Sequence, residues 1–163
     1  MHQRFEDDID PETIPRLSLL LGFGPMLPIL FGGGAALLWP ALGHSPFVGW
    51  VVLWAAAILI FIAGVRRGYG FARQARPSLG ALAGTFWMFF AGLGALPALL
   101  FDPAVAAILL IAGYASVIML DPIAARRGEA PRHFAKIRPP QMLVGVAGLA
   151  ALLASGLLRT GGR

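Results

Sequence analysis

The sequence contains no cysteine among its 163 residues, and only 13% of the residues are charged. Without cysteine there is no disulfide, no thiolate metal ligand and no cysteine nucleophile. An ordinary soluble domain has about 25% charged residues. Hydrophobic residues take the place of charge here, since they make up 58% of the chain and its mean hydropathy is +0.76. A globule of this length cannot bury so much apolar surface, so the composition predicts an integral membrane protein.

Charges are missing altogether from five long apolar stretches of the chain. Each stretch has close to the ~20 residues that a helix needs to cross a bilayer. The alternation of apolar and polar residues that a membrane β-strand requires does not occur in them. We therefore predict an all-α fold, an integral membrane bundle of five transmembrane helices over residues 17–39, 47–65, 79–101, 104–120 and 141–158. An acidic tail of residues 1–16 precedes this transmembrane domain of residues 17–158, and residues 159–163 form a short C-terminal tail.

Prolines and aspartates mark the expected helix ends. Asp102-Pro103 places an N-cap acceptor before a proline at the first helical position. Asp121-Pro122 is expected to end the fourth span and to begin a short surface helix that runs to Arg127 and stops at Gly128. Pro139-Pro140 is expected to begin the fifth span.

The first span contains more helix-breaking residues than the others. Gly22, Gly24, Pro25 and Pro28 lie in its first half. A proline within a membrane helix removes a backbone hydrogen bond that neighbouring groups must replace, so this span is expected to be kinked and packed inside the bundle. A broken helix that lines a substrate path is the alternative interpretation.

Basic residues are distributed very unequally between the two predicted sides of the membrane. One side carries Arg4, Arg16, Arg66, Arg67, Arg73, Arg76, Arg126, Arg127, Arg132, Lys136 and Arg138, whereas the other carries Arg159 and Arg163. Lys and Arg in short loops remain on the cytoplasmic side. The sequence thus predicts a multi-pass protein of the cytoplasmic (inner) membrane, with the N-terminus in the cytoplasm and the C-terminus outside.

The residues needed for catalysis or cofactor binding are also scarce. The five predicted spans contain no ionisable residue of the kind that marks proton relays or ion paths. His2 and His133 lie on the predicted inner side and His44 on the outer, so they cannot share a metal ion. No nucleophile elbow, phosphate-binding loop or dinucleotide fingerprint is present. We expect a protein without enzymatic activity, with no catalytic residues, no metal and no cofactor.

Asp121 is the carboxylate that requires most explanation. It closes the fourth predicted span, where the negative end of a helix dipole disfavours an anion unless a cation is near. Arg66 or Arg67, at the inner end of the second span, is expected to supply that cation in a structural ion pair. A functional carboxylate is the alternative.

The basic inner side has two interpretations. Its cations could bind anionic lipid headgroups, each contributing about 1 kcal/mol, or they could fix the topology alone. The candidates for headgroup contact are Arg66, Arg67, Arg73, Arg76, Arg126, Arg127, Arg132, Lys136 and Arg138. Nucleic acid is not an expected partner, because a cluster at the membrane surface presents little basic surface to a duplex.

Small residues at helical spacing predict close helix packing. They are Gly64 and Gly68 on the second span, Gly80 and Gly84 on the third, and Ala147, Ala151 and Ser155 on the fifth. Such residues pack helices within one chain, or they bind a second copy or another membrane protein.

Three segments resemble an uncharacterised family of small membrane proteins that includes transmembrane protein 69. They are residues 58–68 (ILIFIAGVRRG), the end of the fourth span at Asp121, and residues 134–139 (FAKIRP). The family pattern has a second glycine where Ala63 stands and commonly a tryptophan where Arg67 stands. The resemblance implies a multi-helix membrane protein and brings no catalytic residues with it.

These observations favour a non-enzymatic accessory, assembly or scaffold component of a membrane complex, in contact with the lipid bilayer. The alternative is a small transporter for an apolar or lipid-like substrate. Such a transporter requires a continuous cavity that reaches Pro25, Pro28, Thr85 and Ser116.

Overall fold

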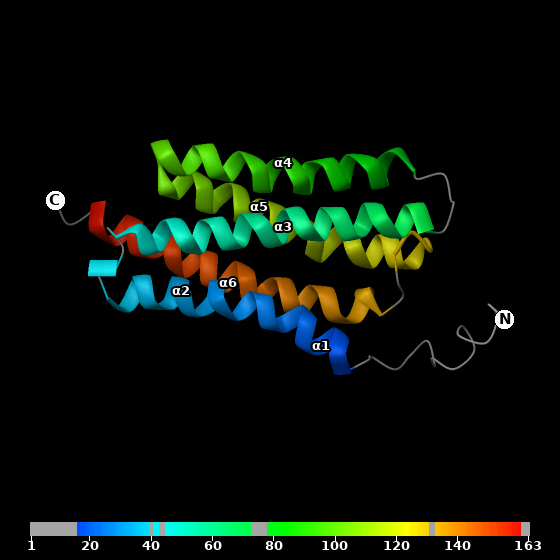
Figure 1. Cartoon of the computed structure of the whole chain (residues 1–163), viewed down its shortest axis with the longest axis horizontal. Coiled ribbons are helices and arrows are strands. Elements are labelled where there is room, and N and C mark those ends of the chain that lie inside the picture. The colour runs from blue at the N-terminus through cyan, green and yellow to red at the C-terminus, as the bar shows by residue number, and fades with distance from the viewer. Residues whose placement is uncertain (1–15, 40, 43–44, 73–77, 131–132, 161–163) are drawn as a thin grey trace.

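The computed structural model describes residues 16–39, 41–42, 45–72, 78–130 and 133–160, and no strand occurs among them. Their helices are α1 (Arg16–Phe23), the 3-10 turn η2 (Gly24–Met26), α2 (Leu27–Leu38), α3 (Pro46–Ala72), α4 (Leu79–Phe101), α5 (Pro103–Arg126) and α6 (Phe134–Thr160). The long helices run side by side along one axis (Figure 1). Each of α2, α6, α5, α4 and α3 packs against the next in that order, and α3 closes the ring on α2 and also contacts α5.

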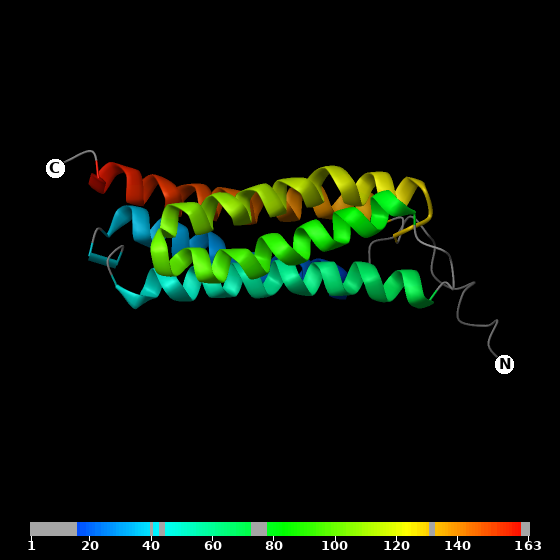
Figure 2. The same ribbon diagram turned by 90° about the horizontal axis from the view of Figure 1, so that it is seen from above.

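The helix ends gather at two opposite ends of the bundle (Figures 1 and 2). One end holds the start of α1, the ends of α3 and α5, and the starts of α4 and α6. Because Arg66, Arg67, Arg126, Arg127, Lys136 and Arg138 all belong to these helix ends, we call it the basic end. Arg159 lies near the C-terminal end of α6, at the opposite end.

Five helical segments are long and apolar enough to cross a membrane. They are Leu19–Leu38, Pro46–Phe71, Leu79–Phe101, Pro103–Arg126 and Phe134–Leu157. Large apolar side chains such as Phe31, Trp50 and Phe61 are more than 60% exposed on the outside of the bundle. Such a surface suits lipid rather than water, so the predicted all-α, five-helix membrane fold is confirmed.

Close contacts between helices depend on glycines in α2 and α6. A Cβ atom at Gly33 would overlap the carbonyl oxygen of Gly148, and a Cβ atom at Gly148 would overlap that of Ile29. The backbones of α2 and α6 therefore touch directly at this crossing, as small residues allow in membrane bundles. Tyr114 of α5 is fully buried, and its hydroxyl donates a hydrogen bond to the carbonyl of Ala55 in α3 at 3.0 Å.

The irregular first span is interrupted at η2, as the run of glycine and proline predicted. Side chains from other helices hydrogen-bond one carbonyl in this interruption and one just before it. Trp54 Nε1 donates to the carbonyl of Pro25 at 2.9 Å, and Gln141 Nε2 donates to that of Gly22 at 2.8 Å. Because lipid cannot hydrogen-bond such groups, these contacts let the chain bend inside the bilayer.

The predicted boundaries at Asp121-Pro122 and at Pro139-Pro140 are wrong. α5 continues through Pro122 to Arg126, so there is no separate surface helix, and α6 begins at Phe134 and runs through both prolines. Ending a helix leaves about four carbonyls without partners, whereas an internal proline removes one N–H donor. In an apolar environment, continuing the helix through a proline therefore costs less free energy than ending the helix there.

The remaining helix ends follow the local signals. Asp102 Oδ1 accepts a hydrogen bond from Ala104 N at 2.8 Å, and Ser78 Oγ accepts one from Ala81 N at 3.1 Å. Gly128 has a φ of +74° just after α5, and the amide of Glu129 donates to the carbonyl of Ala124 at 2.8 Å. This backbone pattern is a Schellman motif, which explains the glycine at this position.

Candidate functional site

Three charged side chains meet inside the bundle near its basic end, and we call them the ion cluster. Asp121 of α5 lies between Arg66 of α3 and Arg138 of α6. Arg66 Nη1 is 2.8 Å from Asp121 Oδ1, and Arg138 Nε is 3.4 Å from Asp121 Oδ2. The three side chains are only 4–10% exposed. Two guanidinium groups share one carboxylate, so the cluster has one positive charge in excess.

The helices extend further than the apolar runs, and this extension places charges within them. The expectation that the spans contain no ionisable residue is wrong, because α3, α5 and α6 include Arg66, Asp121 and Arg138. At about 3.6 residues per turn, each of the three lies one to two turns inside its helix end. Ionisable residues at such positions face the bundle interior and pair with one another, as they do here.

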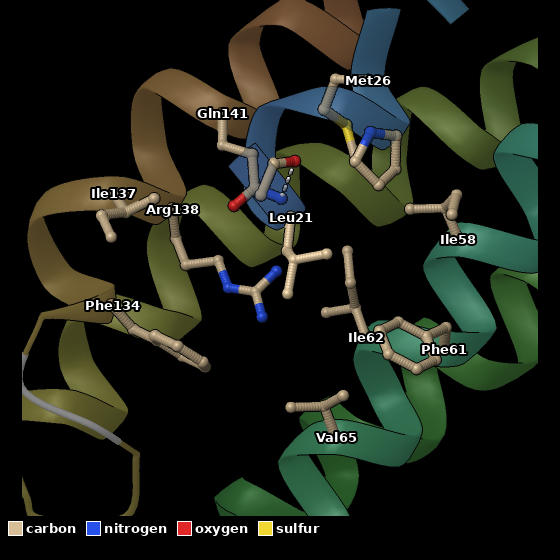
Figure 3. A pocket seen from close by; sticks show the side chains of 12 residues that line it. Leu21, Met26, Ile58, Phe61, Ile62, Val65, Phe134, Ile137, Arg138 and Gln141 are labelled. Atoms are coloured by element: carbon tan, nitrogen blue, oxygen red, sulfur yellow. Dashed lines mark hydrogen bonds between the residues drawn. The ribbon is translucent and has the colours of Figure 1, made fainter. Parts of the chain in front are cut away.

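A cleft of about 310 Å³ opens beside the ion cluster, between α1 with η2, α3 and α6 (Figure 3). Its walls are mostly apolar and include Leu21, Ile58 and Val65. Arg138 is the charged residue of the lining, and its guanidinium group points into the cleft (Figure 3). Apolar walls with one or two convergent polar groups are typical of ligand sites.

Arg138 is held in place by two neighbours. Asp121 approaches its Nε atom, and the Phe134 ring lies beneath the guanidinium carbon at 4.4 Å. Among the described residues, no acceptor forms a hydrogen bond with its two terminal nitrogens, which point into the cleft (Figure 3). Gln141, one turn further along α6, forms the other polar part of the wall.

Of the two predicted partners of Asp121, Arg66 and Arg67, only Arg66 contacts it. Arg66 forms the ion pair, whereas the guanidinium of Arg67 lies over the Phe71 ring at 4.0 Å. Arg66 and Arg67 are consecutive, so their side chains point about 100° apart on the helix. Arg138, the second partner, was predicted only as a lipid contact.

The basic residues predicted to contact headgroups separate into buried and exposed groups. Arg126, Arg127 and Lys136 are exposed at the basic end. Arg66 and Arg138 are turned inward toward Asp121 and do not share the exposed surface of these three, so headgroup contact stays a prediction for both groups. Arg73, Arg76 and Arg132 lie outside the described residues.

A second apolar depression, also of about 310 Å³, lies between α3 and α4, and we call it the α3/α4 groove. Ile60, Ala63, Gly64, Arg67, Leu82, Thr85, Phe86 and Phe89 line it. Gly64 and Gly68 are exposed, and no described atom lies within 4 Å of where a Cβ would stand on either. These two glycines therefore do not serve packing within the described chain.

The other predicted small residues have mixed positions. Gly84 packs within the chain, since a Cβ there would be 3.0 Å from Leu120, whereas Gly80 meets no described atom within 4 Å. Ser155 is buried and donates to the carbonyl of Leu152 at 2.7 Å. Ala151 is partly buried and Ala147 is exposed, so the close contact of α6 lies instead at Gly145 and Gly148.

The cavity expected for a transporter is found only in part. The cleft reaches Pro25, but Pro28, Thr85 and Ser116 are not among its lining residues. Thr85 lines the α3/α4 groove, and Ser116 Oγ donates to the carbonyl of Gly113 at 2.6 Å. The residues named for a substrate path therefore belong to separate places.

Gln141 and Phe134 were not predicted as site residues. Their signal in the sequence was helical spacing, since Phe134 lies one turn before Arg138 and Gln141 one turn after it, once α6 is known to begin at Phe134. Among the described residues there is no group of three or more His, Asp or Glu side chains that could hold a metal ion. Comparison of the chain with protein-family models, with curated proteins and with solved structures finds no match.

Proposed function

We propose that this multi-pass membrane protein is a non-enzymatic accessory, assembly or scaffold component of a membrane complex, and that it binds a transmembrane helix of a partner protein in the α3/α4 groove. The observation that carries the proposal is the open space over Gly64 and Gly68. Glycine is among the poorest helix formers. Two exposed glycines one turn apart in α3 therefore suggest a role outside the chain.

The shape of the groove supports a helix as its occupant. Gly64 and Gly68 share one face of α3, and Ala63 lies next to them at the base of the groove. Small residues let two helix backbones approach closely in a membrane, where van der Waals contact stabilises the pair. Phe86 and Phe89 of α4 form the opposite wall and supply apolar area. A partner helix with its own small residues would fit between these walls.

Substitution of the glycines tests this binding. Gly64→Leu and Gly68→Leu add bulk where a Cβ meets no described atom within 4 Å, so the fold is expected to persist. In mild detergent the wild-type protein should co-elute with its partner, and both variants should lose it. Gly94→Leu is the matched control, because Gly94 of α4 also has no described atom within 4 Å of its Cβ position.

Three outcomes separate the alternatives. Retention of the partner by Gly64→Leu would contradict the groove as the binding site. A wild-type protein that always elutes alone as a stable monomer would contradict the accessory role itself. If the partner proves to be a second copy of this chain, the groove is a self-association surface.

The basic end is proposed to lie in the cytoplasm. The unequal distribution of Arg and Lys supports this orientation. The basic residues of α3, α5 and α6 lie at one end of the bundle. A transporter is not proposed, because the residues expected to line its path are divided between the cleft, the α3/α4 groove and the packed interior.

A further inference from the structure

We infer that the cleft beside the ion cluster is a binding site for an anionic membrane phospholipid, with its headgroup on Arg138 and one acyl chain between α1 with η2, α3 and α6. This site lies on a different face of α3 from the α3/α4 groove, so it does not depend on the proposed partner helix.

Charge is the first argument for an anion. Asp121 is shared by Arg66 and Arg138, and the shorter contact, 2.8 Å, belongs to Arg66. Arg138 thus carries the excess positive charge of the cluster while its side chain is only 10% exposed. A buried charge without full compensation is costly. An anion in the cleft would supply the missing compensation.

The geometry of Arg138 is the second argument. Asp121 engages its Nε atom and Phe134 covers its guanidinium carbon. The two terminal nitrogens remain directed into the cleft (Figure 3). A guanidinium group presents paired donors that match the oxygens of a phosphate. Arg138 is therefore oriented to hold a phosphodiester rather than merely to balance Asp121.

The rest of the cleft suits an acyl chain. Along α3 its lining runs from Val65 past Ile62 to Ile58, and Met26 lies toward the Ile58 end (Figure 3). Seven residues of helix correspond to ~10 Å. The polar group lies toward the basic end and the apolar walls toward the middle of the bundle. A lipid in the leaflet at the basic end would be oriented in the same way, with its headgroup toward the basic end and its acyl chain toward the middle of the bundle.

Lipid retention by purified protein tests the assignment. Delipidated protein in detergent receives one of three additions: phosphatidylglycerol, phosphatidylcholine, or inorganic phosphate without lipid. Native mass spectrometry then counts the bound lipid molecules. We expect one phosphatidylglycerol per chain, about tenfold preferred over phosphatidylcholine, and a higher unfolding temperature with phosphatidylglycerol alone. Arg138→Gln should remove the preference. Arg126→Gln, which removes an exposed charge from the same end, should retain it.

A second pair of variants tests the cleft without changing charge. Val65→Trp fills the cleft, and Val105→Trp places the same bulk on the exposed side of α5. We expect the first to lose the bound lipid and the second to keep it. Lipid retained by Val65→Trp, or lost equally by Arg126→Gln and Arg138→Gln, would overturn the site. An equal rise of the unfolding temperature with inorganic phosphate would show that a free anion, and not a lipid, is bound.

Discussion

Residues of the same type have different roles at the basic end. Arg66 and Arg138 are buried around Asp121, whereas Arg126 and Lys136 are exposed. The sequence predicted a cation for Asp121 but left Arg66 and Arg67 as equal candidates. Only the rotation of α3 relative to α5 decides between them, and rotation depends on packing along the whole helix. Neighbours in sequence were therefore insufficient to identify the pair.

Loss of the central carboxylate should destabilise the bundle. Asp121→Asn leaves Arg66 and Arg138 close together in the interior with no counter-charge. Removing one partner of a buried ion pair costs about 3–5 kcal/mol. We expect a clear fall in the unfolding temperature in detergent, measured by circular dichroism.

The control for this prediction is Asp102→Asn. Asp102 is exposed and caps α5 through a hydrogen bond to Ala104 N, which asparagine can also accept. Its effect should remain below about 1 kcal/mol. Equal unfolding temperatures for the Asp121 and Asp102 variants would show that the ion cluster contributes no stability.

His133 should make stability depend on pH. Burial lowers the pKa of this imidazole below its ordinary value of about 6.5, and the positive charge of Arg138 lowers the pKa further. Between the folded-state and unfolded-state pKa values, the unfolded chain binds more protons, so stability falls as pH decreases through about 6.5. His133→Gln should remove this contribution. Thermal unfolding between pH 7.5 and pH 5 measures it, and a slope that is unchanged in the variant would contradict it.

At the level of elements, prolines were the main source of error. Pro122, Pro139 and Pro140 were expected at helix boundaries, and each lies inside a helix. The rule that proline ends a helix holds best in water, which can satisfy the free carbonyls of a terminated helix. In a membrane the same carbonyls lack partners, so continuation is favoured. Pro25 differs because Trp54 can hydrogen-bond its carbonyl, a contact between distant residues that no local pattern reveals.

The crossing of α2 and α6 should tolerate no side chain at Gly33. A Cβ there would overlap Gly148, so Gly33→Ala must separate the two helices. We expect a loss of at least about 2 kcal/mol of unfolding free energy. Denaturant titration in micelles, followed by tryptophan fluorescence, measures it.

Gly34→Ala provides the matched control on the same helix. No described atom lies within 4 Å of a Cβ at Gly34, and alanine favours a helix over glycine by up to about 1 kcal/mol. This variant should be as stable as the wild type or more so. If Gly33→Ala were equally stable, the direct backbone contact would not hold the helices together.

At the scale of the whole molecule, composition was sufficient for the fold class and for five membrane-spanning segments. Length and hydropathy determine these features because a bilayer imposes one thickness on every helix. The small-residue pattern was less informative. Glycines occur on nearly every helix, and only their contacts show that Gly33 and Gly148 pack internally while Gly64 and Gly68 do not. The cleft also depends on how helices from distant parts of the sequence pack together. No local sequence pattern predicts that packing.

The orientation of the whole bundle yields a last prediction. Glu129→Cys marks the basic end and Ala41→Cys the opposite end, and the absence of native cysteine makes each label unique. With the basic end in the cytoplasm, a membrane-impermeant maleimide should label Ala41→Cys in intact spheroplasts and Glu129→Cys only after lysis. The opposite result would reverse the orientation. Labelling of both from outside would contradict the bundle itself, because α3, α4 and α5 separate the two positions and an odd number of crossings must place them on opposite sides.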